Sequence, residues 1–186
     1  MHQASRYSPK TSQDGRLDRQ IDFIRAIDGL KAVLRQNLVM DGSRRENSCE
    51  HSWHIAVMAL LLQEYSDDPV DISRVLSMLL LHDVVEVDAG DTFCYDEAGH
   101  SDKADREQAA ADRLFGLLPK DQGRCLRALW EEFEARETAE ARFANALDRV
   151  QPLLCNAETE GGTWRIHGIR RPAVEKRMLP VRDGSR

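Results

Sequence analysis

The sequence predicts an all-α protein, a bundle of about six or more helices. Apolar residues recur at three- and four-residue steps through most of the chain, which is the spacing of a buried helix face. No segment has the two-residue alternation of a half-buried strand, and several apolar stretches begin with a side chain that can cap a helix. We therefore expect helices that pack on helices.

Composition favours one globular domain. The chain has 186 residues, of which 41% are hydrophobic and 31% charged, and these values are ordinary for a single folded domain. We expect a loose polar lead-in at 1–16, a principal domain at 17–160 and a C-terminal extension of unknown role at 161–186.

Charge and hydropathy exclude some partners. A formal net charge of -6 provides no positive field for a nucleic-acid polymer, although one or two arginines can still bind a small anion. No apolar run reaches the ~18–20 residues of a membrane span, and the first residues lack the apolar core of a secretory signal. The four cysteines are scattered and form no C-x-x-C pair, which fits reduced thiols in a cytoplasmic protein.

In the first half of the chain, three helices are predicted. The first begins at Leu17 and ends before Asp41. Asn47, followed three residues later by Glu50, resembles a capping box that begins the second helix. Asp71 can cap a third, very apolar helix that continues through His82 and Asp83 to Glu86.

The second half is predicted to begin with a loop at 89–101, because that stretch has no sustained period. Three helices are expected after it, at 103–118, 121–135 and 138–155. Asp148 falls inside the last of them. A turn and one short helix are expected beyond Gly161.

His82 and Asp83 end the most apolar predicted helix, where an ionised carboxylate is costly unless a cation or hydrogen bonds satisfy it. A bound metal ion would do so. Neighbouring helical residues point about 100° apart, so such a site needs ligands from other helices, and His51 and Asp148 are the best candidates. A satisfied core histidine is the alternative interpretation of this dipeptide.

Four motifs follow one another along the chain: Arg45-Glu46-Asn47-Ser48-Cys49-Glu50-His51-Ser52, His82-Asp83-Val84-Val85-Glu86, Ala89-Gly90-Asp91 and Asn145-Ala146-Leu147-Asp148. Together they resemble the HD-domain phosphohydrolases, specifically the branch that contains 5′-deoxynucleotidases. The similarity covers roughly Leu17 to Cys155 and implies an HD-type helical bundle.

The resemblance implies that one divalent ion is held by His51, His82, Asp83 and Asp148. It also implies that Glu86 and Asp91 are acid-base or water-orienting carboxylates, and we favour Asp91 for the water. The alternative for Glu86 is a solvated carboxylate at a helix end. The alternative for Asp91 is an ordinary turn residue. Two imidazoles and two carboxylates suit Mn, Co, Mg, Zn or Fe, so the sequence does not select the metal.

Arg35, placed on the first predicted helix, lies about where similar deoxynucleotidases present a phosphate-binding arginine. Arg44 and Arg45 compete for this role, and a solvated basic patch is the alternative. Gln36 stands where some relatives have tryptophan. His54 could support His51 or begin a second metal site, but only His100 is available as a further ligand before Asp148.

The expected function is metal-dependent hydrolysis of a small phosphomonoester, a (deoxy)nucleoside 5′-monophosphate by resemblance. The alternatives are a catalytically silent metal- or nucleotide-binding module, a metal-dependent oxygenase with two irons, and a purely structural helical domain. Glu86 and Asp91 favour an enzyme over the silent module. The resemblance also implies a homodimer, for which the long apolar helices, with Trp130 and Phe133, offer an apolar surface.

Overall fold

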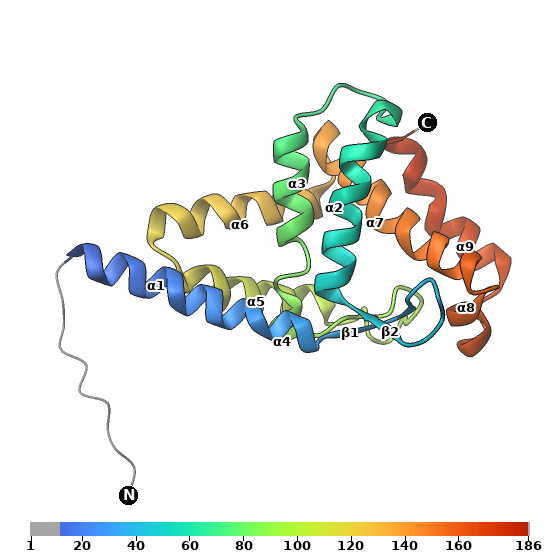
Figure 1. Ribbon diagram of the computed structural model, residues 1–186, viewed down its shortest axis with the longest axis horizontal. Helices are drawn as coiled ribbons and strands as arrows, with labels where there is room; N and C mark the ends of the chain where they lie inside the picture. The colour runs from blue at the N-terminus through green and yellow to red at the C-terminus, as the bar shows by residue number, and fades with distance from the viewer. Residues whose placement is uncertain (1–11, 186) are drawn as a thin grey trace, which may run out of the picture.

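Two helices with side-chain caps stand at the centre of the fold (Figure 1). α2 (Ser48–Leu62) begins at the predicted capping box, where the Asn47 side chain accepts a hydrogen bond from the Glu50 N–H at 2.9 Å. The Glu50 carboxylate in turn accepts from the Asn47 N–H at 3.2 Å. Asp71 caps α3 (Ile72–Leu81) by accepting from the N–H groups of the first turn. Both predicted helix starts are confirmed.

The computed structural model describes residues 12–185, so most of the predicted lead-in at 1–16 lies outside the described residues. α1 (Ser12–Ile27) includes the last five residues of that segment. A 3-10 turn, Asp28–Ala32, follows α1 directly.

A short hairpin replaces the end of the first predicted helix. β1 (Leu34–Leu38) and β2 (Arg45–Asn47) pair antiparallel, so the expectation of one helix up to Asp41 was wrong. Gly42 has a φ of +71° and the Asp41 carboxylate accepts from the Ser43 N–H at 2.9 Å, which turns the chain back on itself. Pairing with β2 then satisfies backbone groups that a helix would have satisfied internally.

The third predicted helix is also shorter than expected. α3 ends at Leu81, and a turn carries His82 and Asp83 before α4 (Glu86–Ala89) begins. Gly90, with a φ of +72°, ends α4. The predicted loop follows, and then come α5 (Lys103–Leu117), α6 (Lys120–Ala135) and α7 (Ala139–Glu158), close to their predicted bounds.

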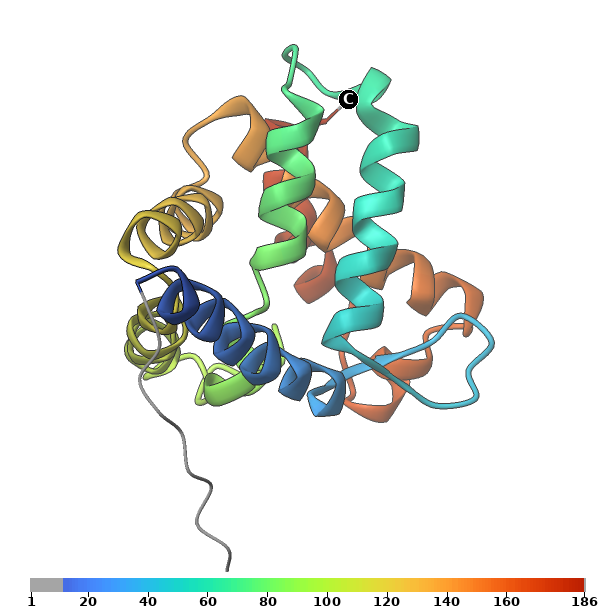
Figure 2. The same ribbon diagram turned by 60° about the vertical axis from the view of Figure 1, so that its left-hand side comes forward.

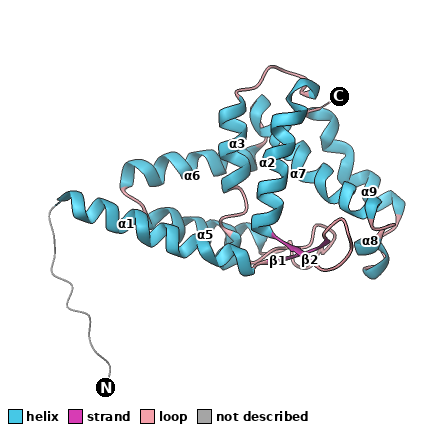
Figure 3. Ribbon diagram, viewed as in Figure 1, coloured by secondary structure: helices cyan, strands magenta, loops and turns pink. Residues whose placement is uncertain are grey.

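The all-α prediction is confirmed, since helices make up most of the described chain and the only sheet in that part has two short strands (Figure 3). α7 crosses behind α2 and α3 (Figure 2), and the three helices enclose the larger apolar cluster. A second cluster joins α1, α4, α5 and α6. Trp130 and Phe133 are 5% and 3% exposed within these clusters, so they do not provide the surface predicted for a dimer.

The C-terminal residues form more structure than the one predicted short helix. α8 (Gly162–Ile166), α9 (Arg171–Met178) and a 3-10 turn at Leu179–Asp183 pack along α7. Thr163 on α8 also donates to the Gln36 carbonyl at 3.3 Å, which fastens β1 to this end of the molecule. Within residues 12–185, no helix is long and apolar enough to cross a membrane.

The packing predicts a clear difference between two leucines. Leu79 on α3 is fully buried in the larger apolar cluster, whereas Leu17 on α1 is 59% exposed. Leu79→Ala should lower the free energy of unfolding by about 2–5 kcal/mol, because it removes packed methyl groups and leaves a cavity. The matched change Leu17→Ala should alter it by less than about 0.5 kcal/mol. Urea unfolding measures both, and equal losses would contradict this core.

Candidate metal centre

Three elements bring four of the predicted site residues together. His51 lies near the start of α2, His82 and Asp83 in the turn after α3, and Asp148 in the middle of α7. Ligating atoms of His51, His82 and Asp83 lie within 4.8 Å of one another. Asp148 Oδ1 is 3.1 Å from His51 Nε2 and 3.9 Å from His82 Nε2. The four side chains therefore share one small volume.

The tautomer of His82 is set by the backbone. Its Nδ1–H donates to the Leu79 carbonyl at 2.9 Å, so Nε2 carries a lone pair. This Nε2 is buried, has no hydrogen-bond partner, and lies 3.0 Å from Asp83 Oδ1. A buried acceptor that faces another acceptor is costly unless a cation lies between them.

His51 is oriented by a side chain that the sequence analysis did not single out. Gln151 donates through its amide nitrogen to Glu46 Oε1 at 2.7 Å, which turns its amide oxygen toward His51. That oxygen accepts from His51 Nδ1–H at 3.0 Å, so His51 Nε2 also carries a lone pair. Gln151 follows Asp148 by three residues on one helix, a spacing that could have identified it.

The donor set suits a divalent ion. Burial lowers the pKa of His51 to about 3, which keeps its imidazole neutral and able to bind a metal. Burial raises the pKa of Asp83 to about 8, although the positive charge of Arg35 acts in the opposite direction. Arg35 alone therefore does not offset the cost of burying the ionised Asp83 carboxylate. Two neutral imidazoles and two carboxylates, with an unpartnered Nε2 among them, fit a bound divalent cation.

Glu86 and Asp91 line the same cavity, which has a volume of about 400 Å³. Ser48 donates its hydroxyl to Glu86 Oε2 at 2.7 Å, and Asp91 accepts a hydrogen bond from the Gln36 backbone. Burial raises the pKa of both carboxyls, that of Glu86 well above its usual value. The structure thus places two carboxyl groups with raised pKa beside the cluster.

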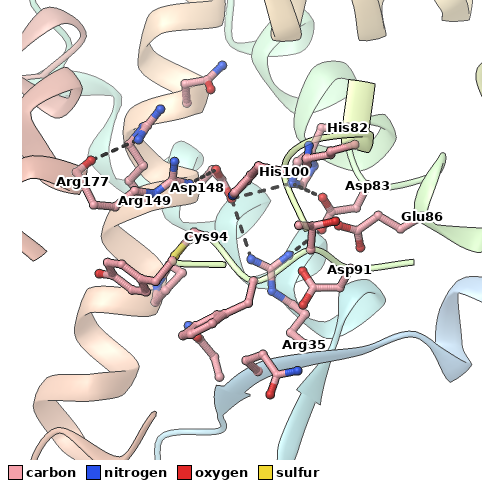
Figure 4. Close-up of a pocket in the computed structure, with 18 of the residues that line it drawn as sticks. Arg35, His82, Asp83, Glu86, Asp91, Cys94, His100, Asp148, Arg149 and Arg177 are labelled. Atoms are coloured by element: carbon pink, nitrogen blue, oxygen red, sulfur yellow. Dashed lines mark hydrogen bonds and ion pairs between the residues drawn. The ribbon is translucent and has the colours of Figure 1, made fainter. Parts of the chain in front are cut away.

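The predicted phosphate-binding arginines differ in position. Arg35 lies on β1, not on a helix, and its Nη1 donates to Asp83 Oδ2 at 2.8 Å inside the cavity (Figure 4). Arg45 lies on β2 and donates to the backbone carbonyls of Leu34 and Arg35. Arg44 pairs with Glu50 at 2.8 Å near the surface. The structure therefore brings Arg35, but not Arg44 or Arg45, to the cavity wall.

Other predicted residues lie at the edge of the site. His54 Nδ1 is 3.2 Å from the Gln151 amide, behind His51 and outside the ligand cluster. His100 lines the cavity, and one group of possible metal ligands is found in residues 12–185. A second metal site, as a di-iron oxygenase requires, is therefore not visible in the described part of the chain.

The far side of the cavity comes from residues that the sequence did not place at the site. The loop after α4 contributes Phe93 and Tyr95, and α8 contributes Trp164. Arg149 on α7 and Arg177 on α9 line the same side (Figure 4). Burial, together with the nearby Arg177 and Arg136, lowers the pKa of Arg149 to about 10. Nothing in the spacing of these residues joins them, because their meeting depends on tertiary packing.

The chain is similar to proteins of known class. The 5′-deoxynucleotidase HDDC2 of Bos taurus is 34% identical over 155 residues, which cover 82% of this chain and 74% of that protein. The Homo sapiens protein of the same name is 33% identical over 141 residues, or 75% of this chain and 68% of that protein.

The solved structures include a close relative. A predicted metal-dependent phosphohydrolase from Magnetospirillum magnetotacticum MS-1 is 59% identical and superposes with a TM-score of 0.90, over 94% of this chain and 88% of that one. The model of the HD domain family matches residues 27–183. This chain belongs to the HD-domain family.

Proposed function

We propose that this HD-domain phosphohydrolase hydrolyses deoxynucleoside 5′-monophosphates to the nucleoside and phosphate, with one divalent ion. One observation carries the proposal: the buried His82 Nε2 has no hydrogen-bond partner and faces the carboxylates of Asp83 and Asp148. In a purely structural core this nitrogen would stay without a hydrogen-bond donor. The arrangement therefore supports metal binding over a structural helical domain.

His51, His82, Asp83 and Asp148 would hold the ion. When bound, the ion polarises a phosphoryl oxygen and lowers the pKa of a water molecule. The ligand set accepts Mn, Co, Mg, Zn or Fe. Arg35, whose guanidinium already reaches this centre, would bind a phosphoryl oxygen through its N–H groups.

Asp91 and Glu86 would move the protons. Asp91, in the loop, would accept the proton of the attacking water as its oxygen bonds to phosphorus. Glu86 has a raised pKa and is therefore suited to hold a proton near neutral pH. It would give that proton to the leaving 5′-oxygen as the ester bond breaks. Their positions on one cavity support an enzyme over a catalytically silent module.

The substrate class rests on the relatives and on the cavity. The relatives are named 5′-deoxynucleotidases, and Phe93, Tyr95 and Trp164 offer aromatic faces to a nucleobase on the cavity wall. All four cysteines are free thiols, which supports the cytoplasmic location expected from the sequence.

We also propose a homodimer, on a different basis from Trp130 and Phe133. From Ile55 to its end, α2 carries only apolar side chains. The side turned from the core exposes a stripe of Trp53, Val57, Leu60 and Leu61, with Trp53 65% and Leu61 68% exposed. Contiguous apolar surface of this kind marks an interaction site. A second copy of the chain, paired about a twofold axis, would cover it.

The proposed activity predicts a defined substrate and metal profile. Phosphate release should be measured on deoxyribo- and ribonucleoside 5′-monophosphates and a 3′-monophosphate, after chelation and re-addition of Mg, Mn, Co, Zn or Fe(II). We expect no turnover after chelation and the highest kcat/KM on the deoxy 5′-monophosphates. Activity that survives chelation would contradict metal dependence, and metal binding without release from any ester would support the silent module.

The proposed roles predict two classes of variant. Asp83→Ala should abolish turnover and metal retention together, because this carboxylate supplies both charge and a ligand. Glu86→Gln and Asp91→Asn should lower kcat about a hundredfold or more while metal content stays near that of the wild type. Elemental analysis beside steady-state kinetics separates the classes. Loss of metal in either of the latter variants would reassign that residue to ligation.

The dimer proposal predicts a mass of about twice the 21.1 kDa of one chain. Size exclusion with light scattering at micromolar concentration measures it. Leu61→Glu should yield monomers, since it buries a charge in the proposed interface. Leu17→Glu, at a site of α1 that is 59% exposed, is the control and should leave the mass unchanged. A wild-type mass near 21.1 kDa would exclude the dimer at that concentration.

A further inference from the structure

Two arginines of the C-terminal half meet beside the candidate metal centre. Figure 4 shows Arg149 and Arg177 on the side of Asp148 that lies away from His82. Arg149 Nη1 donates to the backbone carbonyl of Arg177 at 3.0 Å, so α7 holds α9 at this residue. Arg149 is 6% exposed, and its Nε has no hydrogen-bond partner. A buried guanidinium with an unused donor indicates a polar occupant of this end of the cavity.

Within residues 12–185, Asp148 is the one carboxylate near enough to Arg149 or Arg177 to pair with either. Arg177 Nη2 approaches Asp148 Oδ2 at 3.9 Å, which is too long for a hydrogen bond. Arg136, at the end of α6, also lines the cavity, and the Glu134 carboxylate lies near it. If Asp148 binds a metal ion, that ion offsets the negative charge of the carboxylate. Arg149 and Arg177 then keep a positive charge that a bound anion would offset.

We infer that Arg177 is a phosphate-binding residue of this enzyme, and that Arg149 is the positioning residue that holds it. The inference rests on the proposed function and deepens it: the phosphate of the substrate would lie between Arg35 on β1 and Arg177 on α9. A guanidinium can donate two parallel hydrogen bonds to two oxygens of one phosphate group. The C-terminal helix thereby completes the active site.

The test is Arg177→Gln against Arg171→Gln. Arg171 lies on the same helix, has an 88% exposed side chain and pairs with Glu175, away from the cavity. Titration calorimetry of the metal-loaded protein with inorganic phosphate should give a Kd raised about tenfold to a hundredfold in Arg177→Gln and unchanged in Arg171→Gln. Metal content and unfolding temperature should match the wild type in both, and Arg177→Lys should recover part of the affinity.

Kinetics provide the second measurement. KM should rise by a similar factor for a deoxynucleoside 5′-monophosphate and for p-nitrophenyl phosphate, with little change in kcat, because the contact is made in both ground and transition states. The inference would be overturned if Arg177→Gln bound phosphate as tightly as Arg171→Gln. It would also be overturned if KM rose for the nucleotide alone, or if Arg177→Gln lost its metal. The calorimetry does not depend on which ester is cleaved, so a failed substrate assignment remains distinguishable from a failed phosphate site.

Discussion

The lone pairs of two buried histidines constrain how α2, α3 and α7 meet. Each Nδ1–H is used by a fixed acceptor, the Leu79 carbonyl or the Gln151 amide, so each Nε2 must face the carboxylates of Asp83 and Asp148 as an acceptor. Such an arrangement is unfavourable in a dry interior without a cation. The larger apolar cluster, which includes the fully buried Phe143 and Leu79, holds the three elements in place.

The hairpin supplies the opposite charge. Because the chain leaves its helical path at Val33, Arg35 projects from a strand into the cavity, and Glu46 on the paired strand reaches Gln151 on α7. Arg35 Nε also lies 3.8 Å from Glu46 Oε2, which joins the two strands through their side chains. The same two strands thus offset the charge of the Asp83 carboxylate and orient the His51 imidazole, and a helix at this place would do neither.

Sequence reasoning succeeded where the signal was local. The Asn47 and Asp71 caps and the three later helices follow from spacing and capping residues. The grouping of His51, His82, Asp83 and Asp148 was expected from the motifs that resemble those of the HD-domain family. Sequence reasoning failed at Arg35, because Leu30, Val33 and Leu34 fit a helical period equally well and only pairing with β2 selects the strand. Gln151 and Glu46 were missed because their roles depend on contacts between residues that lie more than 90 positions apart in the chain.

Charge balance explains why the centre needs the C-terminal half of the chain. Arg35 and a divalent ion carry three positive charges, which the buried or half-buried carboxylates of Glu46, Asp83, Asp91 and Asp148 already offset. A phosphate dianion in the same cavity would therefore be repelled unless further cations faced it. Arg149 and Arg177 are held at that place by α7 and α9. On the proposed function, Arg177 supplies a cation for the phosphate that residues 17–160 do not contain.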